Sequence, residues 1–115
     1  MRLPALLLVV TVAWAAAGCT SAQQRGHQLY AERGCAVCHG AAGRGDGPAA
    51  KRLDTPPLDL SDVRAYRQGA GQDQIAASIR NGSGAMPPFR DLTGPEAEDI
   101  AAWIVSLQHS TPRQP

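Results

Sequence analysis

The sequence is poor in large aromatic side chains and has almost no excess of either charge. Its 115 residues include two tryptophans, two tyrosines and one phenylalanine, and its formal net charge at neutral pH is +1. A chain of this length holds one small domain, and so few large side chains leave that domain short of hydrophobic core. The balanced charge excludes the strongly basic surface with which nucleic-acid-binding proteins attract phosphates.

The sequence also lacks internal repeats, low-complexity tracts and any sustained alternation of apolar and polar residues. Without that alternation, no β-strand is predicted. Two segments, 40–60 and 81–94, are instead so dense in glycine and proline that they exclude regular structure and predict loops. Loops of that length in a small domain are usually functional or wrapped around another group.

Helical patterns account for the rest of the chain. The last of them is the clearest, because apolar residues recur with the i, i+3, i+4, i+7 spacing of a buried helix face. Thr93 and Glu96 form a capping box at its start. The predicted helices cover 23–33, 61–68, 73–80 and 95–108. Four short helices joined by long loops predict an all-α fold.

The N-terminus has the composition of a targeting segment. Residues 1–18 hold Arg2, then an apolar run, then small residues. This order is typical of a secretory signal peptide, and the run is short for a transmembrane helix, although a membrane anchor that is never removed is the alternative. Removal of residues 1–18 would leave 97 residues with ten basic and ten acidic side chains.

Cys19 directly follows the small residues AAAG, a context that resembles the lipobox of bacterial lipoproteins, although Ala16 stands where leucine is usual. We therefore expect a lipid on Cys19 that anchors the chain to a membrane. The alternatives are a cysteine discarded with the signal peptide and a free thiol. The predicted division is a signal peptide over 1–18, a tether over 19–24, a domain over 25–109 and a flexible tail over 110–115.

The segment GCAVCHG, residues 34–40, carries the chemistry. Cys35, Cys38 and His39 offer three ligands to zinc, which needs a fourth from His27 or His109. A redox dithiol also uses C-x-x-C, but normally after a strand, and none is predicted. The third interpretation is covalent haem attachment, which C-x-x-C-H favours in an exported chain. One helical turn then presents Cys35 and Cys38 to the haem vinyl groups as thioethers, and His39 to the iron.

Two stretches together resemble class I cytochromes c, especially small bacterial ones. GHQLYAERGCAVCHGAAGRGDGP resembles their opening, and IRNGSGAMPPF with the following IAAWIVSL resembles their closing half. The resemblance implies an all-α cytochrome c fold wrapped around one covalently bound haem c. It also implies that the first and last helices cross, with Gly26 and Tyr30 against Trp103. It assigns the backbone carbonyl of Pro48 as the group that orients His39.

The sixth position of the iron has three candidates. Met86 lies in the proline-stiffened loop GAMPPF and belongs to no helical stripe, and the resemblance points to the same residue. His27 and His109 are the alternatives, each otherwise a solvated side chain. Cationic side chains for the haem propionates remain open among Arg44, Lys51, Arg52 and Arg90.

Ligation by His39 and Met86 would leave no open site on the iron, which favours one-electron transfer over bond-making chemistry. We therefore expect a non-enzymatic electron carrier, anchored on the periplasmic side of a bacterial membrane, that passes electrons between redox protein partners. Two alternatives keep the haem. One is a subunit of a larger oxidoreductase, and the other is a small-ligand sensor or peroxidase-like protein with a labile Met86 bond.

Overall fold

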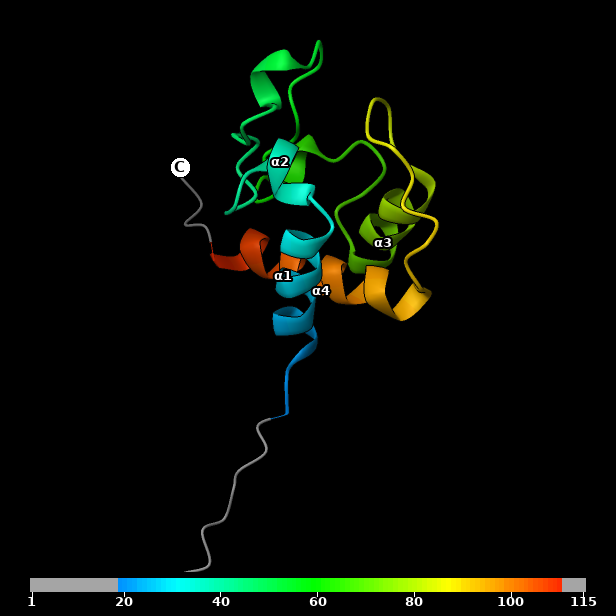
Figure 1. Ribbon diagram of the computed structural model, residues 1–115. Coiled ribbons are helices and arrows are strands. Elements are labelled where there is room, and N and C mark those ends of the chain that lie inside the picture. The colour runs from blue at the N-terminus through cyan, green and yellow to red at the C-terminus, as the bar shows by residue number, and fades with distance from the viewer. Residues whose placement is uncertain (1–18, 111–115) are drawn as a thin grey trace, which may run out of the picture.

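The computed structural model describes residues 19–110 and contains four α-helices in that range (Figure 1). They are α1 (Ala22–Glu32), α2 (Cys35–His39), α3 (Gln72–Asn81) and α4 (Gly94–Ser110), with single 3₁₀ turns at Ala50–Arg52 and Val63–Ala65. Within these residues the only strand-like pairing is an isolated bridge between Ser83 and Met86. The expected all-α fold is confirmed, whereas the predicted signal peptide lies outside the described residues.

The helix boundaries follow from capping chemistry. Ser21 closes a capping box with Gln24 at the start of α1, and Thr93 closes the predicted one with Glu96 at the start of α4. Gly82, at a φ of 79°, ends α3 with a conformation that glycine adopts without strain. The start of α1 at Ala22 makes the end of the predicted tether helical.

The prediction of a helix over 61–68 was wrong. The chain forms only the 3₁₀ turn Val63–Ala65 there, capped by Asp62 rather than by Ser61. The hydroxyl of Ser61 is buried and donates to the carboxylate of Asp59. Val63 and Arg64 face solvent, so a longer helix at this place would have no apolar face to bury.

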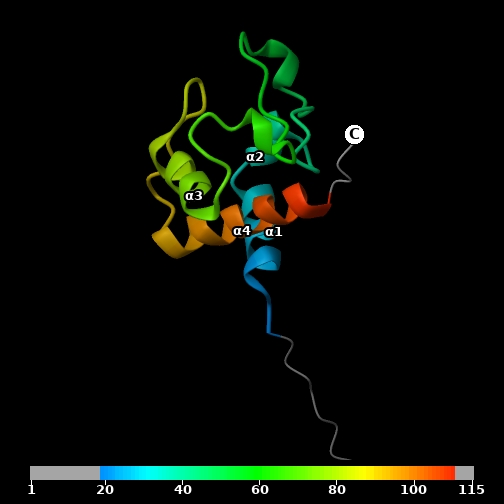
Figure 2. The same cartoon turned by 180° about the vertical axis from the view of Figure 1, so that it is seen from behind.

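The core forms where α1 and α3 pack on α4. Its members are small or aliphatic except for one tyrosine: Tyr30, Leu60, Ile75, Ala76, Ile79, Leu92, Ala97, Ile100, Ala101 and Ile104. Seven of these ten residues lie on α3 or α4. Both views show α4 crossing α1, with α2 beyond the far end of α1 from the N-terminus (Figures 1 and 2).

The expected crossing is confirmed, with Tyr30 against Trp103, whereas Gly26 lies against the backbone of Asp99. Gly26 faces α4 so closely that a β-carbon there would overlap the carbonyl oxygen of Asp99. The rings of Tyr30 and Trp103 lie 4.4 Å apart between centroids. Arg25 adds a bidentate ion pair to Asp99, at 2.8 and 3.2 Å. The close approach at Gly26, the ring contact and the ion pair together fix the crossing of α1 and α4.

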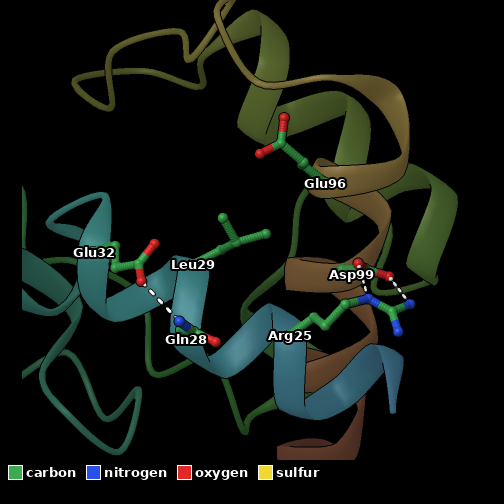
Figure 3. A pocket seen from close by; sticks show the side chains of 6 residues that line it. All are labelled: Arg25, Gln28, Leu29, Glu32, Glu96 and Asp99. Atoms are coloured by element: carbon green, nitrogen blue, oxygen red, sulfur yellow. Dashed lines mark hydrogen bonds and ion pairs between the residues drawn. The ribbon is translucent and has the colours of Figure 1, made fainter. Parts of the chain in front are cut away.

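An open groove of about 290 Å³ runs along the same two helices (Figure 3). Arg25 reaches across it to Asp99, and Gln28 donates a 3.0 Å hydrogen bond to Glu32. Its lining comes entirely from α1 and α4: Arg25, Gln28, Leu29, Glu32, Glu96 and Asp99. None of the residues predicted to bind a cofactor lines this groove. Among residues 19–110, no helix has the length and hydropathy needed to cross a bilayer.

Candidate haem site

The turn that carries the cysteines is the helix α2. Gly34, at a φ of 78°, ends α1 and starts α2, which lets the chain change direction in one residue. Cys35 and Cys38 are half-buried free thiols, three residues apart on this single turn. Positions i and i+3 share a helix face, so the two thiols lie on one side of a single turn, where one partner could reach both. Cys35 packs against the core, and its burial raises the pKa of the thiol.

His39 ends α2 with a defined tautomer. Its Nδ1 lies 3.2 Å from the carbonyl oxygen of Leu58, which can only accept, so Nδ1 carries the proton and Nε2 keeps its lone pair. Burial lowers the pKa of His39, which favours the neutral form of the ring. A neutral imidazole with one nitrogen held by a backbone carbonyl is the state in which histidine binds a metal.

The orienting carbonyl is not the one that the resemblance implied. Leu58, and not Pro48, accepts from His39. Pro48 belongs instead to the loop that wraps the end of α2, where the amides of Gly47 and Ala49 on either side of it donate to carbonyls of that helix. The correction could not have come from spacing, because Leu58 lies nineteen residues from His39 in the chain.

The loop after α2 satisfies the carbonyls at the end of that helix in reverse order. Amides of Gly43, Gly45, Gly47 and Ala49 donate to the carbonyls of Gly40, His39, Cys38 and Val37, at 3.1, 2.8, 3.1 and 2.9 Å. A helix end leaves such carbonyls unpaired unless another segment supplies donors. This explains the glycines, since a β-carbon on Gly47 would overlap the Val37 carbonyl. The glycine density predicted only a loop, whereas glycine at every second position, 43, 45 and 47, was the visible signal for this set of hydrogen bonds, called the clamp below.

Met86 lies in a tight turn in the loop between α3 and α4. Its amide donates to the Ser83 carbonyl at 2.9 Å, and its carbonyl accepts from the Ser83 amide at 3.1 Å. The side chain is half-buried and packs against the same core as Cys35. The loop therefore holds the Met86 thioether at the border of the core.

The two remaining histidines lie elsewhere. His27 is exposed, as expected of a solvated side chain, and it also stacks on Trp103, with ring centroids 4.6 Å apart and an interplanar angle of 13°. His109 is exposed in the last turn of α4. Arg44, Lys51, Arg52 and Arg90, the cations considered for the propionates, are all exposed. The structure therefore brings neither histidine to the α2 turn.

These residues fit a covalently attached haem. Two free thiols share one helical turn, and the histidine beside them has a fixed tautomer and a free Nε2. Leu58, whose carbonyl contacts His39, is 40% exposed, an apolar residue that a porphyrin would cover. The other interpretations fit less well. In the part of the chain described, no three His, Cys, Asp or Glu side chains gather as a zinc site requires, and a helix precedes Cys35 where a redox dithiol has a strand.

Comparison with known proteins agrees with this class of site. The model of the family described as "Cytochrome C oxidase, cbb3-type, subunit III" matches residues 21–104. Cytochrome c-551 of Stutzerimonas stutzeri is 33% identical over 74% of this chain and 79% of its own. Cytochrome c-552 of Hydrogenobacter thermophilus is 33% identical over 89% of this chain and 96% of its own.

A solved structure extends the comparison. A chain of the reducing HAO-like protein complex of Kuenenia stuttgartiensis superimposes with a TM-score of 0.68 and 26% identity. The match covers 75% of this chain but 43% of the other, so this chain spans less than half of that subunit.

Fold and site together define a small all-α protein that carries one covalently bound haem. The chain belongs to the cytochrome c family, within the class I c-type cytochromes. Its cofactor is haem c, and Cys35 and Cys38 are the cysteines of its C-x-x-C-H motif. It is an electron-transfer protein and not an enzyme.

Proposed function

We propose that the chain is an exported, membrane-tethered carrier of single electrons. In this proposal Cys35 and Cys38 form the thioether bonds to haem, and His39 and Met86 are the axial ligands of the iron. The observation that carries it is the α2 turn, where two free thiols adjoin an imidazole whose Nδ1 donates to Leu58 and whose Nε2 keeps its lone pair. When bound, the haem iron supplies the one-electron redox chemistry.

The protein's own residues hold that chemistry in one geometry. The Leu58 carbonyl keeps His39 in the tautomer that ligates, and the amides of the 43–49 loop keep the turn that bears it in place. Met86 would occupy the second axial position, held by the paired hydrogen bonds to Ser83. A thioether ligand favours the reduced iron and so raises the reduction potential. Ligands held in both oxidation states favour electron transfer without bond-making.

The membrane tether rests on Cys19. This cysteine is exposed and stands two residues before Ser21, the residue that caps α1. An acyl group on Cys19 would bury its hydrocarbon in the bilayer and leave the domain on the periplasmic side of a bacterial membrane. Donor and acceptor would be redox proteins. Residues 19–24 would then serve as the tether, the last three of them already in α1, with 25–109 as the cytochrome domain and 110–115 as a tail.

A second candidate keeps the haem and changes the context: a dedicated haem subunit of a larger oxidoreductase. It is favoured by the match to a chain of the reducing HAO-like complex and by the family description, which names a subunit of an oxidase. Gentle solubilisation followed by size-exclusion chromatography separates the two. A free carrier elutes as a small monomer, whereas a subunit elutes with a larger redox protein.

The proposal is tested by the intact mass of the mature protein purified from membranes, with Cys19→Ser as the matched control. We expect the wild-type mass to include one haem and acyl groups on an N-terminal Cys19. The control should keep the haem, lose the acyl mass and leave the membrane fraction. A mature protein without haem would contradict the cofactor attachment, and a haem protein without acyl groups would contradict only the tether.

A further inference from the structure

Tyr30 is the one aromatic residue of the core that carries a polar group, and that group reaches the haem-binding turn. The side chain is 1% exposed. Its ring lies 4.4 Å from that of Trp103, at an angle of 50°. Its hydroxyl donates a buried 2.6 Å hydrogen bond to the carbonyl oxygen of Gly40. Gly40 follows His39 directly in the chain.

The hydroxyl is not needed for packing. A phenylalanine would fill the same space against Trp103 without a polar group to satisfy. A buried hydroxyl destabilises a protein unless it finds a partner, and here the partner is a single carbonyl. Burial raises the pKa of Tyr30, so the hydroxyl stays protonated and remains a donor in neutral and mildly alkaline solution. The structure thus holds a permanent donor against the residue after His39.

A hydrogen bond from the Tyr30 hydroxyl to Gly40 restrains the backbone geometry directly after His39. Its backbone has a φ of 84° and a ψ of 159°, a conformation that residues with a β-carbon rarely adopt. The same carbonyl also accepts from the Gly43 amide at 3.1 Å, and the His39 carbonyl accepts from the Gly45 amide at 2.8 Å. Gly43 and Gly45 belong to the loop that follows, whereas Tyr30 belongs to α1. Tyr30 therefore ties the peptide after His39 to the helix crossing.

We propose that the Tyr30 hydroxyl is a positioning group for the axial histidine, which it orients through the Gly40 carbonyl and thereby sets the reduction potential of the haem. The inference rests on the proposed ligation by His39. The hydroxyl touches neither the iron nor the ligand itself. It acts by fixing the backbone from which His39 extends and by directing the positive end of an O–H dipole towards this turn. A positive dipole near the haem disfavours the oxidised, more positive state.

The test is the substitution Tyr30→Phe in the full-length haem protein, because it removes the hydroxyl and keeps the ring on Trp103. Tyr66→Phe is the matched control. The Tyr66 hydroxyl also donates to a backbone carbonyl, that of Leu60, at the same distance of 2.6 Å. Each variant is examined by spectroelectrochemical titration of the haem and by hydrogen exchange of the Gly45 amide.

We expect Tyr30→Phe to lower the reduction potential and to speed exchange of the Gly45 amide, while Tyr66→Phe changes both less. Equal potentials in wild type and Tyr30→Phe, with haem bound in both, would overturn the positioning role and leave the haem assignment intact. An equal shift in both variants would also overturn it, because general loosening of the core would then be sufficient. Absence of haem from the wild type would instead remove the proposed function.

Discussion

At the scale of single residues, each predicted ligand lies on a stretch of chain that hydrogen bonds to the backbone hold in place, from a distant loop for His39 and within one turn for Met86. Leu58 orients His39, and Ser83 closes the turn that bears Met86. A ligand held in this way keeps its position whether the iron is oxidised or reduced. Met86 can therefore be tested by a substitution that leaves these backbone bonds in place.

Replacing Met86 with alanine removes the thioether and retains the turn with Ser83. We expect the reduced variant to bind carbon monoxide, seen as a change in the haem absorption spectrum. We also expect its reduction potential to fall by roughly 0.2 V, a part of the range of about 0.8 V that axial ligands span. His27→Ala is the control. His27 stacks on Trp103 and does not reach the α2 turn, so its replacement should leave both the carbon monoxide binding and the reduction potential unchanged. Immediate binding of carbon monoxide by the reduced wild type would favour a sensor or peroxidase-like role instead.

Sequence reasoning at this scale succeeds where chemistry is local. C-x-x-C-H encodes two thiols and an imidazole on one turn, and the structure has them on α2. It fails where the partner is a backbone group far along the chain, since a carbonyl leaves no mark in the sequence. This is why Leu58 replaced Pro48, and why the bond from Tyr30 to Gly40 was not foreseen.

At the scale of elements, the crossing of α1 and α4 organises the fold. The amphipathic stripe of α4 and the capping box at Thr93 could be predicted because both depend on residues within one helix. The segment 61–68 could not, because a capping signal makes a helix only where an apolar face is buried. Val63 is 52% exposed there, and tertiary context left one 3₁₀ turn.

Gly26→Ala tests the crossing directly. The new methyl group would overlap the backbone carbonyl of Asp99, which cannot rotate away, so α1 and α4 must separate. We expect the free energy of unfolding to fall by about 3 kcal/mol, the upper part of the range for overpacked cores. Chemical denaturation of the haem protein provides the measurement.

Gly94→Ala is the matched control for this substitution. A β-carbon on Gly94 would find its nearest atom, Nη1 of Arg80, at 3.9 Å, which is ordinary contact. Alanine also favours the helical backbone of α4 over glycine. We expect the control to be as stable as the wild type or slightly more stable. If Gly26→Ala were equally stable, the close approach at the crossing would not limit packing.

At the scale of the whole molecule, stability should depend on two buried phenols in alkaline solution. Burial raises the pKa of Tyr66 to about 12, and it raises that of Tyr30 as well. In the unfolded chain a tyrosine loses its proton near pH 10. Between these values the unfolded state binds fewer protons than the folded state, so the free energy of unfolding falls as pH rises. Below about pH 10 this contribution is constant.

Denaturation curves from pH 8 to 12 measure the effect. We expect the stability of the wild type to be level up to about pH 10 and then to decline. Tyr66→Phe should begin less stable, because the hydrogen bond to Leu60 is lost, and then decline less steeply. Parallel declines in the two proteins would show that Tyr66 does not carry the alkaline transition.

The clamp on α2 also restricts how the chain can vary in length. Between Gly43 and Ala49 every second amide is matched to a carbonyl, and the order of the matches runs backwards along the helix. Insertion of one residue there would put a side chain where each donor belongs, and all later pairings would be out of step. The stretch 51–56 is exposed throughout, and its amides at Arg52 and Leu53 donate only within the adjoining 3₁₀ turn, to Ala49 and Ala50, and not to α2. Gains and losses of residues are thus tolerable beyond the clamp and disruptive inside it.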